Sequence, residues 1–287
     1  MMKKKSIHDS LVRIQELPTL PTVLVRILNI AADPDGTALE LGQLISNDQS
    51  LSASLLRLVN SPYYGFYRKI ESVTQAIVMV GFFEVRRLAL TATAFHTLRP
   101  GSTRFDHIQL WRHSLAAAIA AERCAYAAGV PVHGCFESGL LHDIGKVALD
   151  IVCPQEYEKV LQVAQKGTKR IRAVEQELLG VDHAEAGGLL GEHWNLPSSV
   201  TEAIRCHHAP EDAREFPELA ALTALANYIT YQANLGEFSA PVPAECPRQA
   251  LELLNFRGNP CEDIAFDLEN NRARIEEFIG AVKSDAA

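Results

Sequence analysis

The chain has 287 residues, of which 47% are hydrophobic and 22% are charged, and its formal net charge is −8 with a pI near 5.7. This length and balance predict a globular protein with enough apolar material for one large core or two ordinary ones. The negative charge argues against broad nucleic-acid binding, which requires basic residues that release counterions from phosphates, so we expect no direct nucleic-acid partner.

In chain order, the first half predicts a series of amphipathic helices. Apolar residues recur at helical spacing in LPTVLVRILNIA and SLSASLLRLVN. The expected buried stripes are Val23-Ile27-Ile30, with Leu24 and Leu28 along the same face, and Leu51-Leu55-Leu58. We find no sustained alternation of apolar and polar residues of the kind that predicts a half-buried strand. The sequence therefore predicts an all-α protein.

A break between two helical regions falls at LRPGSTRFD, residues 98–106, where proline, glycine and serine follow one another. We therefore expect a two-lobed molecule, with a first lobe over residues 1–100 and a second over 101–287 that includes a C-terminal helical extension.

The sequence gives no sign of membrane association or secretion. No apolar run reaches the ~18 residues of a membrane span, and the basic start, residues 1–11, lacks the apolar segment of a secretory signal. The six cysteines are widely scattered and form no C-x-x-C pair, which is typical of reduced, mostly buried thiols. We expect a cytoplasmic protein.

The second half places histidines at expected helix ends. His142 and Asp143 are adjacent in GLLHDIGKVAL, and neighbouring helical side chains point ~100° apart, so they can share an ion only where a helix ends. Gly145 favours such an end. His183 follows Asp182, which we expect to cap a helix.

Two more histidines are adjacent, and another lies within a helical segment. His207 and His208 end the segment SSVTEAIRCHHAP, whose Ser199 and Glu202 have the spacing of a capping box. His113 lies in LWRHSLAAAIAAE. The complete set of candidate metal ligands is His113, His142, Asp143, His183, His207 and His208.

Imidazole and carboxylate together suit a divalent transition metal, namely iron, zinc or manganese. Such an ion lowers the pKa of bound water and polarises a phosphoryl oxygen, which is the basis of metal-assisted phosphoester hydrolysis. Asp143 and Lys146 are therefore the candidate catalytic residues, with Lys146 as a phosphate contact.

Simpler interpretations exist for each of these residues taken alone. A single histidine is more often structural than ligating, and Lys146 would be a solvated charge near a helix C-terminus, where the macrodipole favours a cation. The metal hypothesis rests on the coincidence of the whole set, and it covers both a working site and an ancestral one.

Several segments carry a family resemblance, among them LPTLPTVLVRIL, LGQLISNDQSLSASLLRLVNSPYYG, LLHDIGKVAL and GVDHAEAGGLLGEHWNLPSSVTEAIRCHHAP. The chain resembles HDOD proteins, a branch of the HD-domain phosphohydrolase superfamily related to the HD-GYP cyclic-di-GMP phosphodiesterases. The resemblance covers nearly the whole chain. It implies an N-terminal HDOD lobe over 1–100 and an HD-like helical lobe over 101–287.

The superfamily's ligand order is a histidine, the His-Asp doublet, further histidines and a late aspartate. By motif position, every candidate ligand above matches, but the late aspartate should fall in ALANYI, where this chain has Asn227. Asparagine is neutral and a poorer ligand than carboxylate, so Asn227 is a degenerate ligand position. The G-Y-P signature is also missing after the histidine pair.

The resemblance implies a role in bacterial signal transduction, as a response-regulator output or regulatory module. Its partners would be two-component or cyclic-dinucleotide signalling proteins, and its catalysis would be weak or absent. The alternative is an active metal-dependent phosphohydrolase that acts on a nucleotide or cyclic dinucleotide. A third interpretation is a scaffold without metal. The missing carboxylate favours the regulatory interpretation.

Overall fold

The computed structural model describes residues 22–33, 35–98, 106–167, 169–235, 246–256 and 258–283. Within these ranges every regular element is a helix and none is a strand, so the all-α prediction is confirmed. The prediction about a secretory signal concerns residues 1–11, and the predicted lobe boundary falls at residues 99–105. Both segments lie outside the described residues. Among the described helices, none combines the length and apolar character that a bilayer crossing needs.

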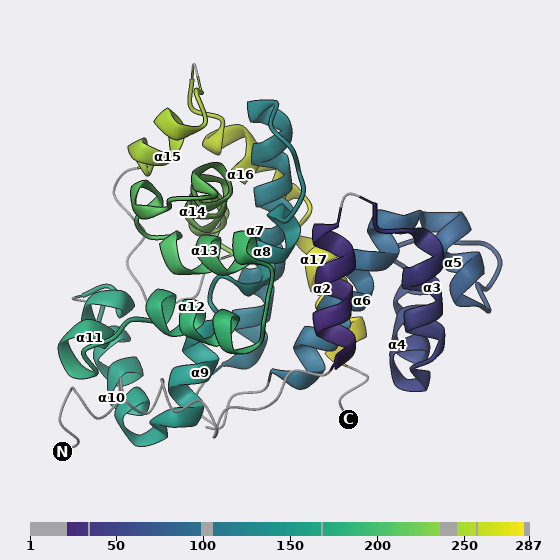
Figure 1. The fold of residues 1–287 in the computed structure, drawn as a ribbon, viewed down its shortest axis with the longest axis horizontal. Coiled ribbons are helices and arrows are strands. Elements are labelled where there is room, and N and C mark those ends of the chain that lie inside the picture. The colour runs from purple at the N-terminus through teal and green to yellow at the C-terminus, as the bar shows by residue number, and fades with distance from the viewer. Residues whose placement is uncertain are drawn as a thin grey trace. The chain divides into compact units, whose positions relative to one another are not determined.

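The described residues form two compact units. The N-terminal unit consists of residues 22–98 and 271–283. Its helices, shown in Figure 1, are α2 (Thr22–Ala32), α3 (Ala38–Ser46), α4 (Gln49–Val59), α5 (Val73–Val80), α6 (Phe82–Thr97) and α17 (Arg272–Lys283).

The core of the N-terminal unit follows the predicted periodicity closely in α4 and less closely in α2. The α4 stripe of Leu51, Leu55 and Leu58 is buried as expected. In α2 Leu24, Ile27 and Leu28 are fully buried as expected, whereas Val23 and Ile30 are only half-buried. The predicted α2 stripe was therefore too wide at Val23 and Ile30, because the core takes only the i, i+3, i+4 face of Leu24, Ile27 and Leu28.

The last helix belongs to the N-terminal unit and not to the second lobe in which the sequence analysis placed it. α17, yellow in Figure 1, packs against α4. Its buried residues are Ile275, Phe278, Ile279 and Val282, and the Phe278 and Tyr63 rings meet edge-on with centroids 6.3 Å apart. The reason is that the apolar face of α17 packs on α4, a helix more than 200 residues earlier in the chain.

The second unit, which we call the histidine unit, comprises the described residues between 106 and 270. Its helices are α7 (His107–Ala128), α8 (Cys135–Leu141), α9 (Ile144–Val152), α10 (Pro154–Ala164), α11 (Ile171–Leu178), α12 (His183–His193), α13 (Ser198–Cys206), the 3₁₀ helix η1 (Pro210–Asp212), α14 (Pro217–Gln232), α15 (Arg248–Leu253) and α16 (Cys261–Asn270).

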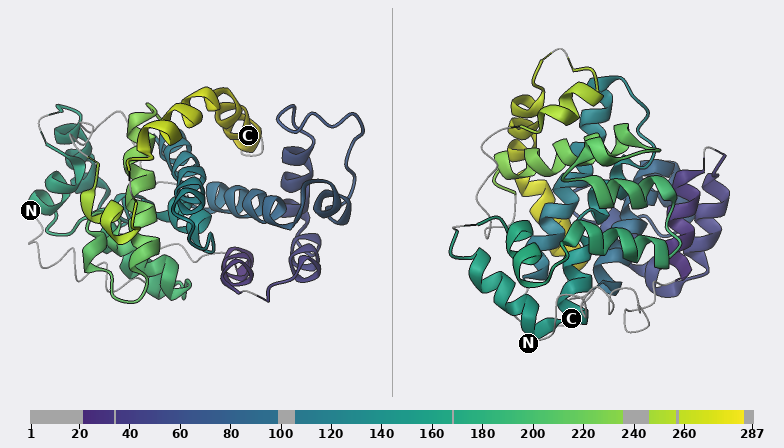
Figure 2. Two further views of the ribbon diagram at one scale, coloured as in Figure 1. Left: turned by 90° about the horizontal axis from the view of Figure 1, so that it is seen from above. Right: turned by 60° about the vertical axis from the view of Figure 1, so that its left-hand side comes forward.

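Two packing relationships position the histidines. The long helix α7 lies against α8 and α14, and α12 lies against α9 and α13, as the two further views of the ribbon allow the reader to follow (Figure 2). The facing surfaces of α7 and α14 are rich in buried alanine, and small side chains let helix axes approach closely. The unit thus brings the C-terminal ends of α8 and α13 and the N-terminal end of α12 close to His113, in the N-terminal half of α7.

Candidate metal centre

The His-Asp doublet lies at the junction of two helices. α8 ends at Leu141, His142 is its C-cap, and Asp143 is the N-cap of α9. Because the chain changes direction here, two adjacent side chains point toward one centre, as the sequence analysis required.

Gly145 does not end the helix, contrary to the expectation, since it is the second residue of α9. Its role is a close helix approach. A Cβ atom at Gly145 would lie 1.8 Å from the carbonyl oxygen of His183 and 2.6 Å from the amide nitrogen of Gly187. Only glycine lets α9 come this near to α12, and that approach brings Asp143 to His183.

The remaining histidines are held at helix ends or inside a helix. His183 is the first residue of α12, and Asp182 caps this helix by accepting the amide of Glu185 at 3.0 Å, as predicted. His207 is the C-cap of α13, His208 follows it, and His113 lies within α7.

The capping box predicted for α13 was wrong. The helix begins at Ser198 after Pro197 and has no side-chain cap. Glu202 instead accepts the backbone amides of Arg214 and Phe216, at 2.8 and 2.6 Å. Because the backbone amides of the loop before α14 bind the Glu202 carboxylate, it does not cap α13.

All six candidate ligands converge in two groups joined by Asp143. His113, His142 and Asp143 form one group and His183, His207 and His208 the other, with the ligand atoms of each group within 4.8 Å of one another. Asp143 Oδ2 lies 3.4 Å from His113 Nε2 and 3.3 Å from His142 Nε2. Its Oδ1 lies 3.3 Å from His183 Nε2 and 3.9 Å from His207 Nε2.

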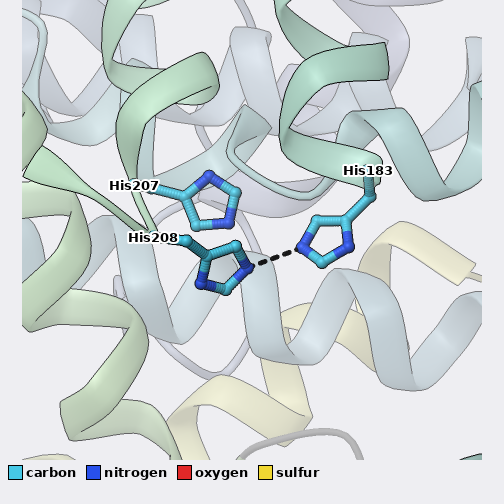
Figure 3. Close-up of side chains that lie close together, drawn as sticks. All are labelled: His183, His207 and His208. Atoms are coloured by element: carbon cyan, nitrogen blue, oxygen red, sulfur yellow. Dashed lines mark hydrogen bonds between the residues drawn. The ribbon is translucent and has the colours of Figure 1, made fainter. Parts of the chain in front are cut away.

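Figure 3 shows the three imidazoles of the second group turned toward one another. His183 Nε2 and His208 Nε2 are 2.8 Å apart, and the rings of His207 and His208 lie 4.0 Å apart between centroids. Imidazoles of neutral charge tolerate this crowding when a hydrogen bond or a cation lies between their nitrogens.

Hydrogen bonds at the outer ring nitrogens fix the tautomers of four histidines. His142 Nδ1 and His207 Nδ1 donate to the carbonyls of Gly139 and Ile204, both at 2.7 Å. His183 Nδ1 donates to Glu175 Oε2 at 2.6 Å. His113 Nδ1 donates to Thr230 Oγ1 at 3.1 Å, because the Thr230 hydroxyl donates its own hydrogen to the Asn227 backbone carbonyl at 2.7 Å. Each Nε2 then carries its lone pair into the centre, the arrangement typical of metal-ligating histidines.

This arrangement leaves electron-rich atoms that the protein itself does not satisfy. His113 Nε2 and His142 Nε2 face each other at 3.1 Å. Among the described residues, Asp143 Oδ1, His207 Nε2 and Asn227 Oδ1 are buried without a hydrogen-bond partner. Burying such atoms unpaired costs ~1–3 kcal/mol each. A cation would satisfy them, so these residues fit a divalent metal ion.

The electrostatics favour the ligating forms of most of these residues. Burial and His142 lower the pKa of His113 to about 3 against the opposing effect of Asp143. Burial and neighbouring histidines also hold the pKa values of His207 and His208 well below the ordinary value. Burial alone would raise the pKa of Asp143, but His142 and Lys146 hold it well below its usual range.

His183 is the exception. Burial lowers its pKa, but the Glu175 carboxylate outweighs burial and raises it. A histidine must lose its extra proton to bind a metal. Because Glu175 stabilises the protonated form of His183, metal binding here would release that proton.

Lys146 is not the solvated charge that one interpretation allowed. It lies in the first turn of α9, only 1% exposed, and its Nζ donates to Asp143 Oδ2 at 2.7 Å. The ammonium group therefore compensates the Asp143 carboxylate at the centre of the cluster. Asn227, on α14, is also buried, and its side chain is among the groups that act on the pKa of His113.

Glu175, which the sequence did not reveal, accepts a hydrogen bond from the His183 ring nitrogen that faces away from the centre. Glu175 is fully buried on α11 and accepts the backbone amide of His183 at 3.0 Å and the hydroxyl of Tyr157 at 3.1 Å. A signal existed, because Glu175 follows Ile171 and Val174 at i+4 and i+1 on the apolar face of α11. A carboxylate on such a face needs a buried partner.

The comparisons with known proteins concern the family and the fold. The HDOD domain model matches residues 17–210, a range that includes all six candidate ligands and ends before Asn227. An uncharacterized protein of Treponema pallidum (strain Nichols) is 30% identical over 218 residues, which is 75% of this chain and 42% of that protein. The chain thus spans less than half the length of this relative.

Two solved structures share the fold over almost the whole chain. An HDOD domain protein of unknown function from Geobacter sulfurreducens has a TM-score of 0.80 at 26% identity, covering 98% of this chain and 97% of that one. A candidate signal transduction protein from Marinobacter aquaeolei VT8 has a TM-score of 0.82 at 22% identity, covering 98% of this chain and 66% of that one.

Proposed function

Because this chain belongs to the HDOD domain family, we propose that it is a regulatory module of bacterial signal transduction, with a metal centre and little or no hydrolytic turnover. The family membership predicted from the sequence motifs is thereby confirmed.

The candidate ligands supply the metal part of the proposal. His113, His142 and Asp143 would hold one ion, and His183, His207 and His208 another, with Asp143 in reach of both groups. This mixed imidazole and carboxylate set suits iron, zinc or manganese. A bound ion would acidify water and polarise a phosphoryl oxygen.

One observation supports weak turnover above all others, and it is Asn227. A buried amide stands where the superfamily's late aspartate is expected, and its Oδ1 has no hydrogen-bond partner among the described residues. An amide offers an oxygen but no charge, and loss of such a group commonly costs ~10–100-fold in metal affinity or activity. Lys146 is also occupied by Asp143, which leaves it poorly placed to receive a phosphate.

The signalling part of the proposal draws on the relatives. The Marinobacter structure is that of a candidate signal transduction protein, and this chain covers only part of it, as it covers only part of the Treponema relative. We infer that the domain works beside other signalling components, such as two-component or cyclic-dinucleotide proteins.

The second candidate function is an active phosphohydrolase. The observation that favours it is the convergence of all six ligands, with the Asp143 carboxylate ionised and three histidines in the neutral form. The two candidates differ in turnover and not in metal content, so both must be measured.

The test combines elemental analysis with a phosphodiesterase assay on protein purified without added metal. We expect at least one transition-metal ion per chain and hydrolysis of cyclic-di-GMP or simple phosphodiesters near background. Asn227→Asp should tighten metal binding by ~10-fold or more, because it restores a negative ligand. Asn29→Asp, which adds the same charge on an exposed position of α2, is the matched control.

Two results would contradict the proposal. Less than about a tenth of an ion per chain after loading with each metal would remove the metal centre. Robust metal-dependent hydrolysis by the native chain, abolished in Asp143→Ala, would replace the regulatory function with the enzymatic one.

A further inference from the structure

Two cysteines outside the metal centre face each other in the histidine unit. Cys246 precedes α15 and Cys261 is the first residue of α16, fifteen positions along the chain, and their Sγ atoms are 3.2 Å apart. The sequence analysis treated all six cysteines as scattered, reduced thiols, because this pair has no C-x-x-C spacing. The fold creates the pair by returning the chain after α15.

The distance between the two sulfurs is close to what a covalent bond would need. A disulfide bond is ~2.05 Å long, so the sulfurs must move together by only ~1.2 Å. The two sulfurs form a hydrogen-bonded pair, so the two side chains point toward each other. Both cysteines are free thiols in this structure.

The two thiols differ in a way that suits sequential oxidation. Cys246 is half-buried and so accessible to small molecules, whereas Cys261 is 1% exposed. The hydrogen bond from Cys261 lowers the pKa of Cys246 against the effect of burial, and the same bond raises the pKa of Cys261. The accessible thiol is therefore the better nucleophile, with its partner behind it.

The other thiols for which a shift is resolved are poorly suited to react. Burial raises the pKa values of Cys124 and Cys153 to about 12, and burial also raises the pKa of Cys206. Thiols in such surroundings are inert because the thiolate is the reactive form. Oxidation should therefore be selective for the pair.

We propose that Cys246 and Cys261 form a reversible disulfide when the protein meets a peroxide. The Cys246 thiolate attacks one oxygen of hydrogen peroxide, the O–O bond breaks, and Cys246 becomes a sulfenic acid with release of hydroxide. The sulfur of Cys261 then displaces the sulfenic hydroxyl, the S–S bond forms, and its proton leaves with that hydroxyl as water. Two thiols and one peroxide give one disulfide and two waters, and a dithiol reductant reverses the change.

The bond would fasten a specific part of the fold. It closes the segment that contains α15, and α15 packs against α14 and η1. α14 carries Asn227 and Thr230, and η1 follows His208 by one residue. Oxidation would thus restrict the helices that adjoin the histidine cluster without touching its ligands.

The experiment treats fully reduced protein with a small excess of hydrogen peroxide, followed by alkylation in denaturant. Before alkylation we expect intact mass to fall by about 2 Da per chain. After alkylation we expect the number of modified thiols to fall from six by two, and peptide mapping to find Cys246 linked to Cys261. Dithiothreitol should restore all of the thiols. The oxidised protein should also unfold at a higher temperature than the reduced protein, by several degrees, because a closed segment loses entropy when unfolded.

Matched variants identify the pair. Cys246→Ser, at the half-buried position, should abolish the 2 Da loss, whereas Cys124→Ser should retain it. Peptide mapping of the native chain needs no variant, so a folding defect in either protein leaves the proposal testable. Six intact thiols after a peroxide dose that oxidises a model dithiol would overturn it, as would a bond between any other two cysteines or accumulation of sulfinic acid at Cys246.

Discussion

At the scale of single residues, Glu175 controls how His183 faces the candidate metal centre. Its carboxylate accepts the Nδ1 proton and the backbone amide of His183, which fixes the Nε2 lone pair toward Asp143. In Glu175→Gln the amide lacks the charge that makes His183 basic, so we expect metal affinity to fall ~10–100-fold. Competition against a chromophoric chelator measures this change.

The same helix supplies the control for this prediction. Glu177→Gln alters an exposed carboxylate whose side chain is 57% accessible and which pairs with Lys169, so metal affinity should not change. Equal affinities of Glu175→Gln and the native chain would show that Glu175 serves only packing.

The residue scale also shows where prediction from sequence stops. The identities of the candidate ligands were accessible because imidazole and carboxylate groups are visible in the sequence. The burial of Lys146 and the pairing of Glu175 were not, since both depend on how separate helices pack. A charged residue near a helix end looks the same in sequence whether it meets water or a buried carboxylate.

At the scale of elements, the contact between α9 and α12 depends on Gly145. A side chain there would meet the backbone of His183, and backbone atoms cannot move aside as a flexible side chain can. We expect Gly145→Ala to cost roughly 3 kcal/mol or more of unfolding free energy, or to prevent folding of the histidine unit. Denaturant unfolding followed by circular dichroism measures the change.

Gly280 provides the opposite case. It is exposed in α17 and a Cβ there meets nothing within 4 Å, so Gly280→Ala should be neutral or stabilise by ~0.5–1 kcal/mol. A Gly145→Ala protein as stable as Gly280→Ala would contradict the close-approach explanation.

The contact of α13 with the loop before α14 should depend on pH through Glu202. Burial raises its pKa, but hydrogen bonds from the amides of Arg214, Phe216 and Glu215 outweigh burial and lower it. A folded-state pKa below the ordinary value means that the stabilisation is complete above the ordinary glutamate pKa of ~4.3 and is lost as pH falls below it. The stability difference between the native chain and Glu202→Gln should therefore shrink below about pH 4.

Chemical unfolding across pH 3–6 measures this difference, with Glu211→Gln on η1 as the control for a general charge effect. A difference that stays constant over that range would show that the amide hydrogen bonds do not discriminate between the two protonation states. Sequence analysis assigned Glu202 to a capping box, because local spacing cannot reveal a partner a dozen residues away.

At the scale of the whole molecule, the chain builds two cores, and α17 belongs to the first of them. Phe278 is buried and contacts Tyr63. We expect Phe278→Ala to cost ~3–5 kcal/mol and to act on the N-terminal unit. Hydrogen exchange should then speed up in α4 and α17, with α12 and α13 protected as before.

Phe266→Ala, on α16 in the histidine unit, is the matched control, since Phe266 is 68% exposed and its removal leaves no cavity. Faster exchange throughout both units in Phe278→Ala would mean that they unfold as one. The sequence predicted helices and a division, but the membership of α17 follows from tertiary packing that periodicity does not encode.

The candidate ligands come from segments spread between His113 and His208, so a bound ion would hold together segments that are far apart along the unfolded chain. Bringing these segments together costs chain entropy. The free energy of metal binding would offset this cost. Loading and folding of the histidine unit would then be one equilibrium, and the share of folded molecules would rise with the free metal concentration. A module built in this way would report the metal supply of its surroundings through its own abundance, whether or not it ever cleaves a phosphoester.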